Sequence, residues 1–166
     1  HGFAVQAVHT VLHNGVRISS TAVRAALADG NMRVAQSYLG RPYSISGRVE
    51  HGDGLGKQLG FPTANIQLKH NRPPLSGIFV VRVHGDGLPP MQGVASLGVR
   101  PTVRQDGKPV LEVHVFDFSS EIYNRHMRLD FLHKLRDEEK YPDVETLTRQ
   151  IALDVENAKQ WFKQHD

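Results

Sequence analysis

Residues 110–118 read Val-Leu-Glu-Val-His-Val-Phe-Asp-Phe, and this alternating stretch indicates the fold class. Successive side chains of a strand point to opposite faces, so every second residue shares a face. The apolar face of this stretch carries Leu111, Val113 and Val115. The other face carries Glu112, His114, Phe116 and Phe118. We therefore predict a strand over 110–118 with one face in a core and a carboxylate among rings on the other.

Short apolar stretches of the same kind occur on both sides of this strand. We predict further strands over 43–49, 78–83, 94–99 and 127–132. Turn-rich segments separate them, such as Gly-Asp-Gly-Leu-Pro-Pro at 85–90 and Arg-Gln-Asp-Gly-Lys-Pro at 104–109. Many short strands with turn residues between them favour an antiparallel barrel or sandwich over βαβ units.

Helices are predicted at the two ends of the chain. After Pro142, Asp143 can cap a helix whose apolar residues recur at helical spacing, at Val144, Leu147, Ile151, Val155, Ala158 and Phe162. This spacing predicts one face that packs on the strands. Near the start, Ser19 or Ser20 can cap a helix through Ala28 that Gly30 closes, and Asn31 can cap a second helix ending at Gly40.

Composition limits the function classes. The 166 residues contain no cysteine, which excludes disulfides and thiolate catalysis, and no apolar run approaches the 18 residues of a membrane span. The start has neither an initiator Met nor a signal-peptide pattern, so we expect an internal part of a longer cytoplasmic protein.

The net charge of +3 comes from the first part of the chain. Residues 1–66 hold six Lys/Arg against three Asp/Glu, and residues 67–166 hold fourteen of each. No Lys/Arg run and no basic–aromatic stripe accompanies this excess, so a site for a small polyanion explains it as well as a polynucleotide does.

Residues 52–65, Gly-Asp-Gly-Leu-Gly-Lys-Gln-Leu-Gly-Phe-Pro-Thr-Ala-Asn, contain the groups that a nucleotide triphosphate site requires. Glycines let backbone N–H groups approach an anion, and a lysine adds a positive charge. The stretch is neither a Walker A loop, because Gln58 follows Lys57, nor the G-x-G-x-x-G pattern. From spacing alone, a phosphate site and a mobile glycine-rich hairpin loop both remain open.

The whole string, with Pro-Thr-Ala-Asn directly after the glycines, resembles the signature of bacterial riboflavin kinases. Residues 41–162 resemble the kinase module of the bifunctional riboflavin kinase/FMN adenylyltransferases, also called FAD synthetases. The stretches that carry the resemblance are 39–43, 52–65, 74–79, 98–102, 111–114 and 134–138. One departure is Tyr123-Asn124 in place of the family's Tyr-Gly, and we expect the turn to survive because Asn tolerates left-handed backbone geometry.

The resemblance implies a mainly β fold, a small six-stranded Greek-key barrel with a C-terminal helix. It implies phosphorylation of the riboflavin 5′-hydroxyl by ATP with Mg²⁺, giving FMN and ADP, with Glu112 as base or orienting group. The implied ATP contacts are Gly52, Gly54, Gly56, Lys57, Pro62, Thr63 and Asn65, of which Thr63 and Asn65 would also ligate Mg²⁺. A second loop, 133–142, would cover the flavin, with Phe116, Leu135 and Arg136 as expected flavin contacts.

Residues 1–40 are expected to be a helical remnant of the adenylyltransferase domain, and 41–166 the kinase domain. Ile18–Thr21 and Val23-Arg24 resemble the last motif of that upstream domain, whose other nucleotide motif is not in this chain. We therefore expect no FAD formation, and no nucleic-acid or membrane partner. Two alternatives remain open: a non-catalytic module that binds flavin or nucleotide, and a basic barrel that binds oligonucleotides.

Overall fold

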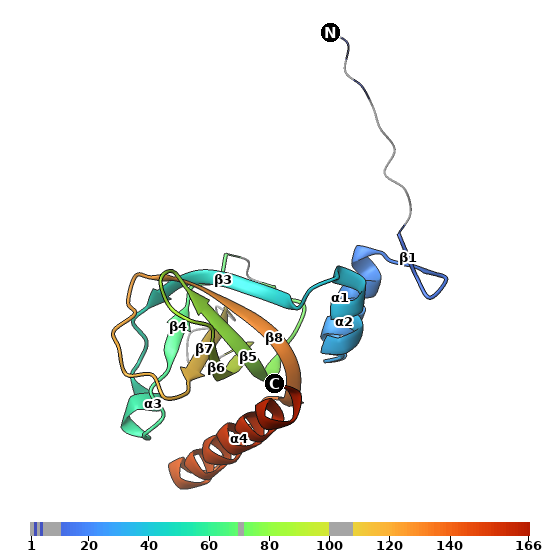
Figure 1. Cartoon of the computed structure of the whole chain (residues 1–166). Coiled ribbons are helices and arrows are strands. Elements are labelled where there is room, and N and C mark those ends of the chain that lie inside the picture. The colour runs from blue at the N-terminus through green and yellow to red at the C-terminus, as the bar shows by residue number, and fades with distance from the viewer. Residues whose placement is uncertain (1, 3, 5–10, 70–71, 100–107) are drawn as a thin grey trace.

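The computed structural model describes all residues except 1, 3, 5–10, 70–71 and 100–107, and its centre is a closed antiparallel barrel (Figure 1). The barrel strands are β3 (Tyr43–Glu50), β4 (Ala64–Ile66), β5 (Gly77–Gly85), β6 (Met91–Val99), β7 (Pro109–Val115) and β8 (His126–Arg136). They follow one another around the barrel in the order β3-β4-β7-β6-β5-β8. Because β4 pairs with β7 instead of β5, the connection is a Greek key, and the predicted fold class is confirmed.

The barrel interior is filled by the alternating apolar residues that the sequence predicts. Leu111 and Val113 of β7 are at most 1 % exposed, and they pack with Phe79, Leu97 and Phe131 from neighbouring strands. A second, smaller cluster lies outside the barrel wall, where α4 covers β5 and β6. The turn at Tyr123-Asn124 is present as expected, with Asn124 at φ 63° and its N–H donating to the Val49 carbonyl at 2.9 Å.

Strand β7 ends earlier than predicted. Asp117 has φ 52°, a left-handed conformation that turns the chain out of the strand after Val115. Phe116 keeps the outer face, where it packs in the cluster under α4, whereas Phe118, beyond the turn, packs against the inner cluster. The prediction that Phe118 shares a face with Glu112 is therefore wrong.

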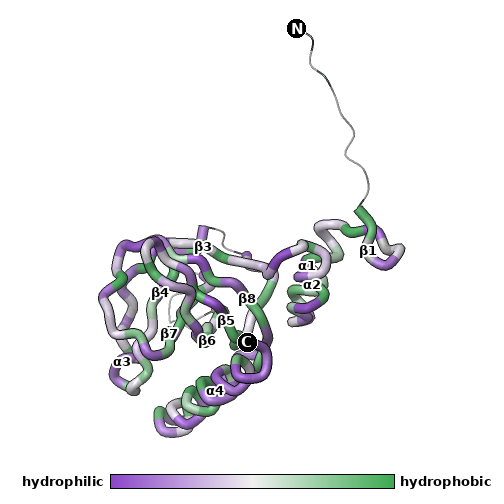
Figure 2. The backbone as a smooth tube through the Cα atoms, in the orientation of Figure 1, coloured by the Kyte–Doolittle hydropathy of each residue, from purple (hydrophilic) through white to green (hydrophobic). Residues whose placement is uncertain are grey.

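Helix α4 (Val144–His165) begins where the sequence predicts. The Asp143 carboxylate accepts a hydrogen bond from the Thr146 N–H at 2.7 Å, which caps the first turn. Hydrophobic and hydrophilic positions alternate along the helix in Figure 2. Val144 is 58 % exposed, so its predicted burial is wrong: this first turn lies ahead of the part of α4 that packs on the barrel through Ala158 and Phe162.

The N-terminal part forms two helices and a small hairpin. Helix α1 (Ser20–Ala28) is capped by Ser19, and α2 (Met32–Leu39) by Asn31 with Gly40 at its end, as predicted. The hairpin consists of β1 (Leu12–His13) and β2 (Val16–Arg17). The buried residues of the two helices, Ala26, Leu27, Met32 and Ala35, belong to the same cluster as the barrel interior. Among the described residues, no helix has the length and apolarity needed to cross a membrane.

Candidate active site

Three polar residues lie side by side on the outer face of the barrel. Asn65 of β4 is the register partner of Glu112 of β7, and Glu112 is the register partner of Ser96 of β6. Directly opposed residues of antiparallel strands have side chains on the same face, with Cβ atoms about 5 Å apart. The fold therefore brings the expected catalytic carboxylate next to one of the two expected metal ligands, from positions 47 residues apart in sequence (112 minus 65).

The glycine loop lies directly over this row. A Cβ on Gly52 would overlap the Asn65 amide, and a Cβ on Gly56 would come within 3.0 Å of the Thr63 hydroxyl. At Gly56 a Cβ would also lie 2.5 Å from the Phe61 carbonyl oxygen, a backbone atom, so this position requires glycine, whereas at Gly52 the Asn65 amide would have to move. The structure thus brings Gly52 close to Asn65, Gly56 close to Thr63, and Asn65 beside Glu112, while the roles of these residues stay predictions.

A short helix, α3 (Leu55–Gln58), shapes the loop. Gly54 precedes it in the left-handed conformation (φ 72°), and Gly60 follows it at φ 86°, so both positions require glycine. The Phe61 N–H donates to the Gly56 carbonyl at 2.8 Å and closes the turn. Lys57 is exposed in the last turn of α3, where its ammonium is available to an anion.

His114, to which the sequence assigned no role, supports the end of the glycine loop. Its Nδ1 lies 2.8 Å from the Pro62 carbonyl oxygen, and its ring meets the Phe61 ring edge-on at 5.8 Å between centroids. His114 lies two residues beyond Glu112 on the same face of β7, so the strand that carries the carboxylate also holds the Phe61-Pro62 step. The alternation of 110–118 placed His114 on this face, but its partner is distant in sequence.

Glu138 reaches the same row from the segment after β8. The Ser96 hydroxyl donates to its carboxylate at 3.1 Å, and that carboxylate lies over the Cα of Gly98, where any side chain would collide. Ser96 is the register partner of Glu112. The segment that follows β8 therefore passes beside the candidate site before α4 begins. The sequence placed Glu138 in the loop 133–142 that is expected to cover the flavin, but it named Leu135 and Arg136 as the contacts and gave Glu138 no role.

The three expected flavin contacts all lie at the interface with α4. Phe116 is 8 % exposed, and the Lys159 ammonium lies 5.3 Å from its ring centroid. Leu135 packs against the same outer cluster. Arg136 forms a bidentate pair with Asp154, through Nε to Oδ1 at 2.9 Å and Nη2 to Oδ2 at 2.6 Å.

Hydrogen bonds and opposite charge stabilise the ion pair between Arg136 and Asp154. Burial alone would lower the pKa of Arg136, but the hydrogen bonds and negative charge of Asp154 outweigh it and raise the pKa above its usual value. Asp154 is only 5 % exposed and also accepts a hydrogen bond from Gln150 at 3.0 Å. The third guanidinium nitrogen of Arg136 donates to the Asp137 carbonyl, so the edge of the group is occupied and its plane faces Tyr141.

The donor set fits a hard cation that keeps most of its water. Asn65 offers a neutral oxygen on the strand beside Glu112, and Thr63 offers another two residues earlier. Mg²⁺ is usually held by few protein ligands together with phosphate oxygens. Within the described ranges, no group of three or more His, Cys, Asp or Glu could hold a metal by itself.

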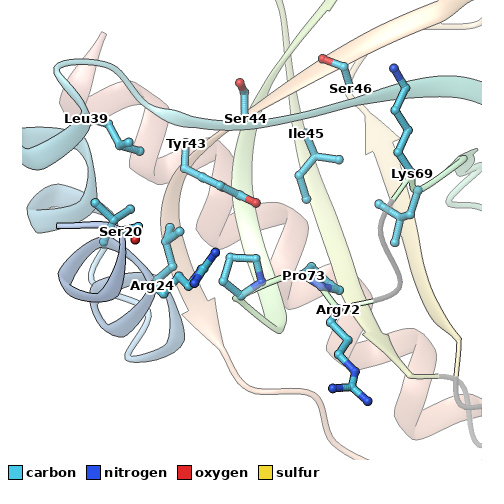
Figure 3. A pocket seen from close by; sticks show the side chains of 14 residues that line it. Ser20, Arg24, Leu39, Tyr43, Ser44, Ile45, Ser46, Lys69, Arg72 and Pro73 are labelled. Carbon is cyan, nitrogen blue, oxygen red and sulfur yellow. The ribbon is translucent and has the colours of Figure 1, made fainter. Parts of the chain in front are cut away.

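A cavity of about 670 Å³ lies elsewhere, between α1 and the start of β3 (Figure 3). The ring of Tyr43 reaches into it towards Arg24 and Pro73, and burial raises the pKa of the Tyr43 hydroxyl. None of the residues that line this cavity belongs to the glycine loop or to the row that contains Glu112.

Known proteins share the fold and the motifs. The riboflavin kinase family, described as flavokinase, matches residues 39–162. The bifunctional riboflavin kinase/FMN adenylyltransferase of Escherichia coli K12 is 46% identical over 98% of this chain and 51% of its own length. The protein of the same name from Pseudomonas fluorescens is 49% identical over 95% of this chain and 50% of its own length. The chain thus spans about half the length of these curated relatives.

Two solved structures are similar to the barrel. The crystal structure of a macrolide-efflux protein from Streptococcus pneumoniae superposes with a TM-score of 0.81 at 35% identity, over 93% of this chain and 50% of that one. Riboflavin kinase from Trypanosoma brucei superposes with a TM-score of 0.52 at 23% identity, over 74% and 80% of the two chains. At that identity the second likeness concerns the fold alone.

Proposed function

Because this chain belongs to the riboflavin kinase family, we propose that it transfers the γ-phosphoryl group of ATP to the 5′-hydroxyl of riboflavin, giving FMN and ADP. The observation that carries the proposal is the register of Asn65 with Glu112, under a glycine loop that leaves no room for side chains at Gly52 and Gly56. Phosphoryl transfer depends mainly on alignment and on neutralising charge, so a compact site of this kind is sufficient.

The glycine loop would hold the triphosphate. Gly52, Gly54 and Gly56 would allow the backbone N–H groups to contact phosphate oxygens, and Lys57 would add its charge. Pro62 would keep the chain in position as it enters β4. Thr63 and Asn65 would ligate Mg²⁺, which when bound would neutralise part of the phosphate charge.

Glu112 would act on the acceptor. Its carboxylate would orient the 5′-hydroxyl of riboflavin and accept the proton as that oxygen bonds to the γ-phosphorus and the bond to ADP breaks. The register of Glu112 with Asn65 supports this role, because Asn65 is the proposed contact to Mg²⁺ and phosphate. Donor and acceptor would therefore meet between β4 and β7.

The flavin would lie between Phe116 and the segment 133–142. Leu135 and Arg136 stand at the start of that segment, and the guanidinium plane of Arg136 is suited to stack on a flat ring while its edge stays paired with Asp154. We keep Phe116, Leu135 and Arg136 as proposed flavin contacts. ATP as the phosphoryl donor supports a cytoplasmic location.

The longer relatives also carry FMN adenylyltransferase in their names. We propose that a full-length protein containing this chain joins the two activities, and that residues 1–40 are the remnant of the adenylyltransferase part. FAD formation by this chain alone is not expected, because the resemblance in residues 18–24 covers one motif of that part.

The deciding experiment is incubation of the folded chain with ATP, Mg²⁺ and riboflavin, followed by chromatography of the flavins. FMN should form, and FAD should not accumulate when FMN and ATP are supplied. Riboflavin binding without FMN formation would refute the kinase proposal in favour of a non-catalytic module. Weakening of oligonucleotide binding with salt in a gel-shift assay would instead favour the nucleic-acid alternative.

A further inference from the structure

The last residues of β8 face in different directions because the strand contains irregularities. Lys134 is the register partner of Phe79, Arg136 is the partner of Ile78, and the register shifts between these pairs. Phe79 lies in the inner cluster and Ile78 in the outer one, so Lys134 points to the barrel interior and Arg136 to α4. Bulges commonly re-aim side chains in this way next to functional sites.

Lys134 runs between the N-terminal helices and the segment after β8. Its aliphatic chain lies against Gly30, in the turn between α1 and α2, where a Cβ would overlap the Lys134 Cδ. Its ammonium lies 2.6 Å from the Asp137 carboxylate and 6.0 Å from the Phe79 ring centroid. The Lys134 side chain is 18% exposed and that of Asp137 is 83% exposed, so a largely buried lysine stem ends in an ion pair at the surface.

Asp137 is the first residue after β8, and Glu138 follows it directly. The hydrogen bond from Lys134, and then its positive charge, lower the pKa of the Asp137 carboxyl, as expected for a direct ion pair. Glu138, the next residue, is bonded to Ser96 beside Glu112. A chain of direct contacts therefore connects the α1–α2 turn to the candidate active site through Gly30, Lys134, Asp137 and Glu138.

We propose that Lys134 is a positioning residue for the acceptor substrate. Its stem packs against Gly30 and its ammonium pairs with Asp137, and these two contacts position the segment 137–142 over the flavin side of the site. This inference rests on the proposed function, because it assigns the acceptor side of that reaction to the segment. The ATP side, at Gly52, Gly56 and Thr63, makes none of these contacts. The position of α1 and α2 should therefore affect the binding of riboflavin and not that of ATP.

The first test removes the positive charge of Lys134 and keeps a side chain of similar length. Lys134→Met should raise the KM for riboflavin by about threefold, the effect expected for a largely surface ion pair, and leave the KM for ATP unchanged. Lys134→Arg should restore the wild-type KM because the cation is kept. Asp137→Asn should have the same effect as Lys134→Met, and the double variant should show no further rise.

The second test uses two glycines with the same backbone conformation. Gly30 has φ +73° with Lys134 against it, whereas Gly40 has φ +69° with nothing within 4 Å of a Cβ. Alanine should strain both turns similarly, as thermal unfolding would measure, but only Gly30→Ala should raise the riboflavin KM. An equal effect of the two alanines on that KM, or an unchanged riboflavin KM in Lys134→Met, would overturn the inference.

The failure of the proposed function would look different. In that case the wild-type chain would form no FMN, and the variants would be compared through riboflavin binding, followed by quenching of flavin fluorescence. Weaker riboflavin binding in Lys134→Met with rescue in Lys134→Arg would still support the inference. Equal binding in wild type and both variants would overturn it.

Discussion

Single residues determine how much space the candidate site leaves between its strands and the glycine loop. Asn65 and Glu112 oppose each other across two strands, and the glycines above them have no side chains that would fill the space between the loop and the row. Thr63 lies two residues before Asn65, with its hydroxyl close to Gly56. The chemistry proposed for the site therefore depends on a few side chains whose removal should affect different steps.

Glu112→Gln should lower turnover by about a hundredfold or more, the usual contribution of a positioned acid–base group, with little change in the KM for ATP. Glutamine keeps the size of the side chain but cannot accept the proton. Steady-state FMN formation measures both constants, with Glu156→Gln on the exposed side of α4 as the control. A KM for ATP that rises as turnover stays normal would contradict the assigned role.

Thr63→Ala and Asn65→Ala should each weaken binding of Mg–ATP by about tenfold, because each removes an oxygen ligand or a hydrogen bond to the phosphates. Calorimetric titration with Mg–ATP measures the affinity directly. Gln67→Ala, exposed just after β4, is the matched control. Normal affinity in both site variants would remove their proposed role.

At the scale of elements, β8 and α4 are joined by a buried ion pair and a stack of rings. Arg136 pairs with Asp154, whose side chain is 7% exposed. The ring of His133 stacks on Trp161 at 6.0 Å, and Trp161 stacks on His165 at 4.2 Å. These contacts hold the helix against the strand from which the proposed flavin segment departs.

Asp154→Ala should lower the free energy of unfolding by about 3 kcal/mol, because it leaves the Arg136 guanidinium partly buried without its partner. The double variant Arg136→Met, Asp154→Leu should recover most of the loss, since neither charge remains. Urea denaturation measures both, and Glu156→Ala on the same helix is the control. A double variant as unstable as the single one would show that the charge pair is not the cause.

The stack at His133 should make stability depend on pH. Burial, and then the nearby charge of His165, lowers the pKa of His133 below its ordinary value of 6.5. The unfolded chain then binds more protons than the folded one just below that value, so stability falls as the pH decreases. The melting temperature should drop between about pH 7.5 and pH 5.5, and it should drop less in His133→Gln.

The control for this pH effect is His126→Gln, at an exposed position of the same strand. It should keep the pH dependence of the wild type. Identical pH profiles for wild type and His133→Gln would assign the effect to other groups.

At the scale of the whole molecule, the N-terminal helices share a core with the barrel. Leu27 of α1 is 1% exposed and lies in the cluster that contains Phe79 and Phe131. The proposed boundary at residue 40 divides an adenylyltransferase remnant from the kinase domain. The side chains of the two parts nevertheless pack in one core. Whether the parts unfold together can be measured.

Leu27→Ala should lower the free energy of unfolding by about 3 kcal/mol, the usual effect of removing a buried leucine side chain, and the protein should still unfold in one transition. Urea denaturation followed by circular dichroism and by Trp161 fluorescence would report on the helices and on α4. Leu153→Ala, at a position 51% exposed, should have little effect. Two separate transitions would show that α1 and α2 unfold independently of the barrel.

The sequence by itself determined the local features. These features depend on neighbours in the chain: the alternation of 110–118, which the structure keeps as far as Phe116, the caps at Ser19, Asn31 and Asp143, and the spacing along α4, which it keeps after Val144. The motif around Thr63 and Asn65 likewise indicated the family. These signals are readable because backbone conformation and periodic burial are set within a few residues.

Only the tertiary structure decided which residues meet. Three contacts join positions far apart in the chain. They are the pairing of Asn65 with Glu112, the contact of His114 with the Pro62 carbonyl, and the packing of Lys134 against Gly30. Phe116 was placed on the face of Glu112 by alternation, yet it is covered by α4. The physical reason is that strand register, bulges and helix docking depend on packing between distant segments, which no local pattern contains.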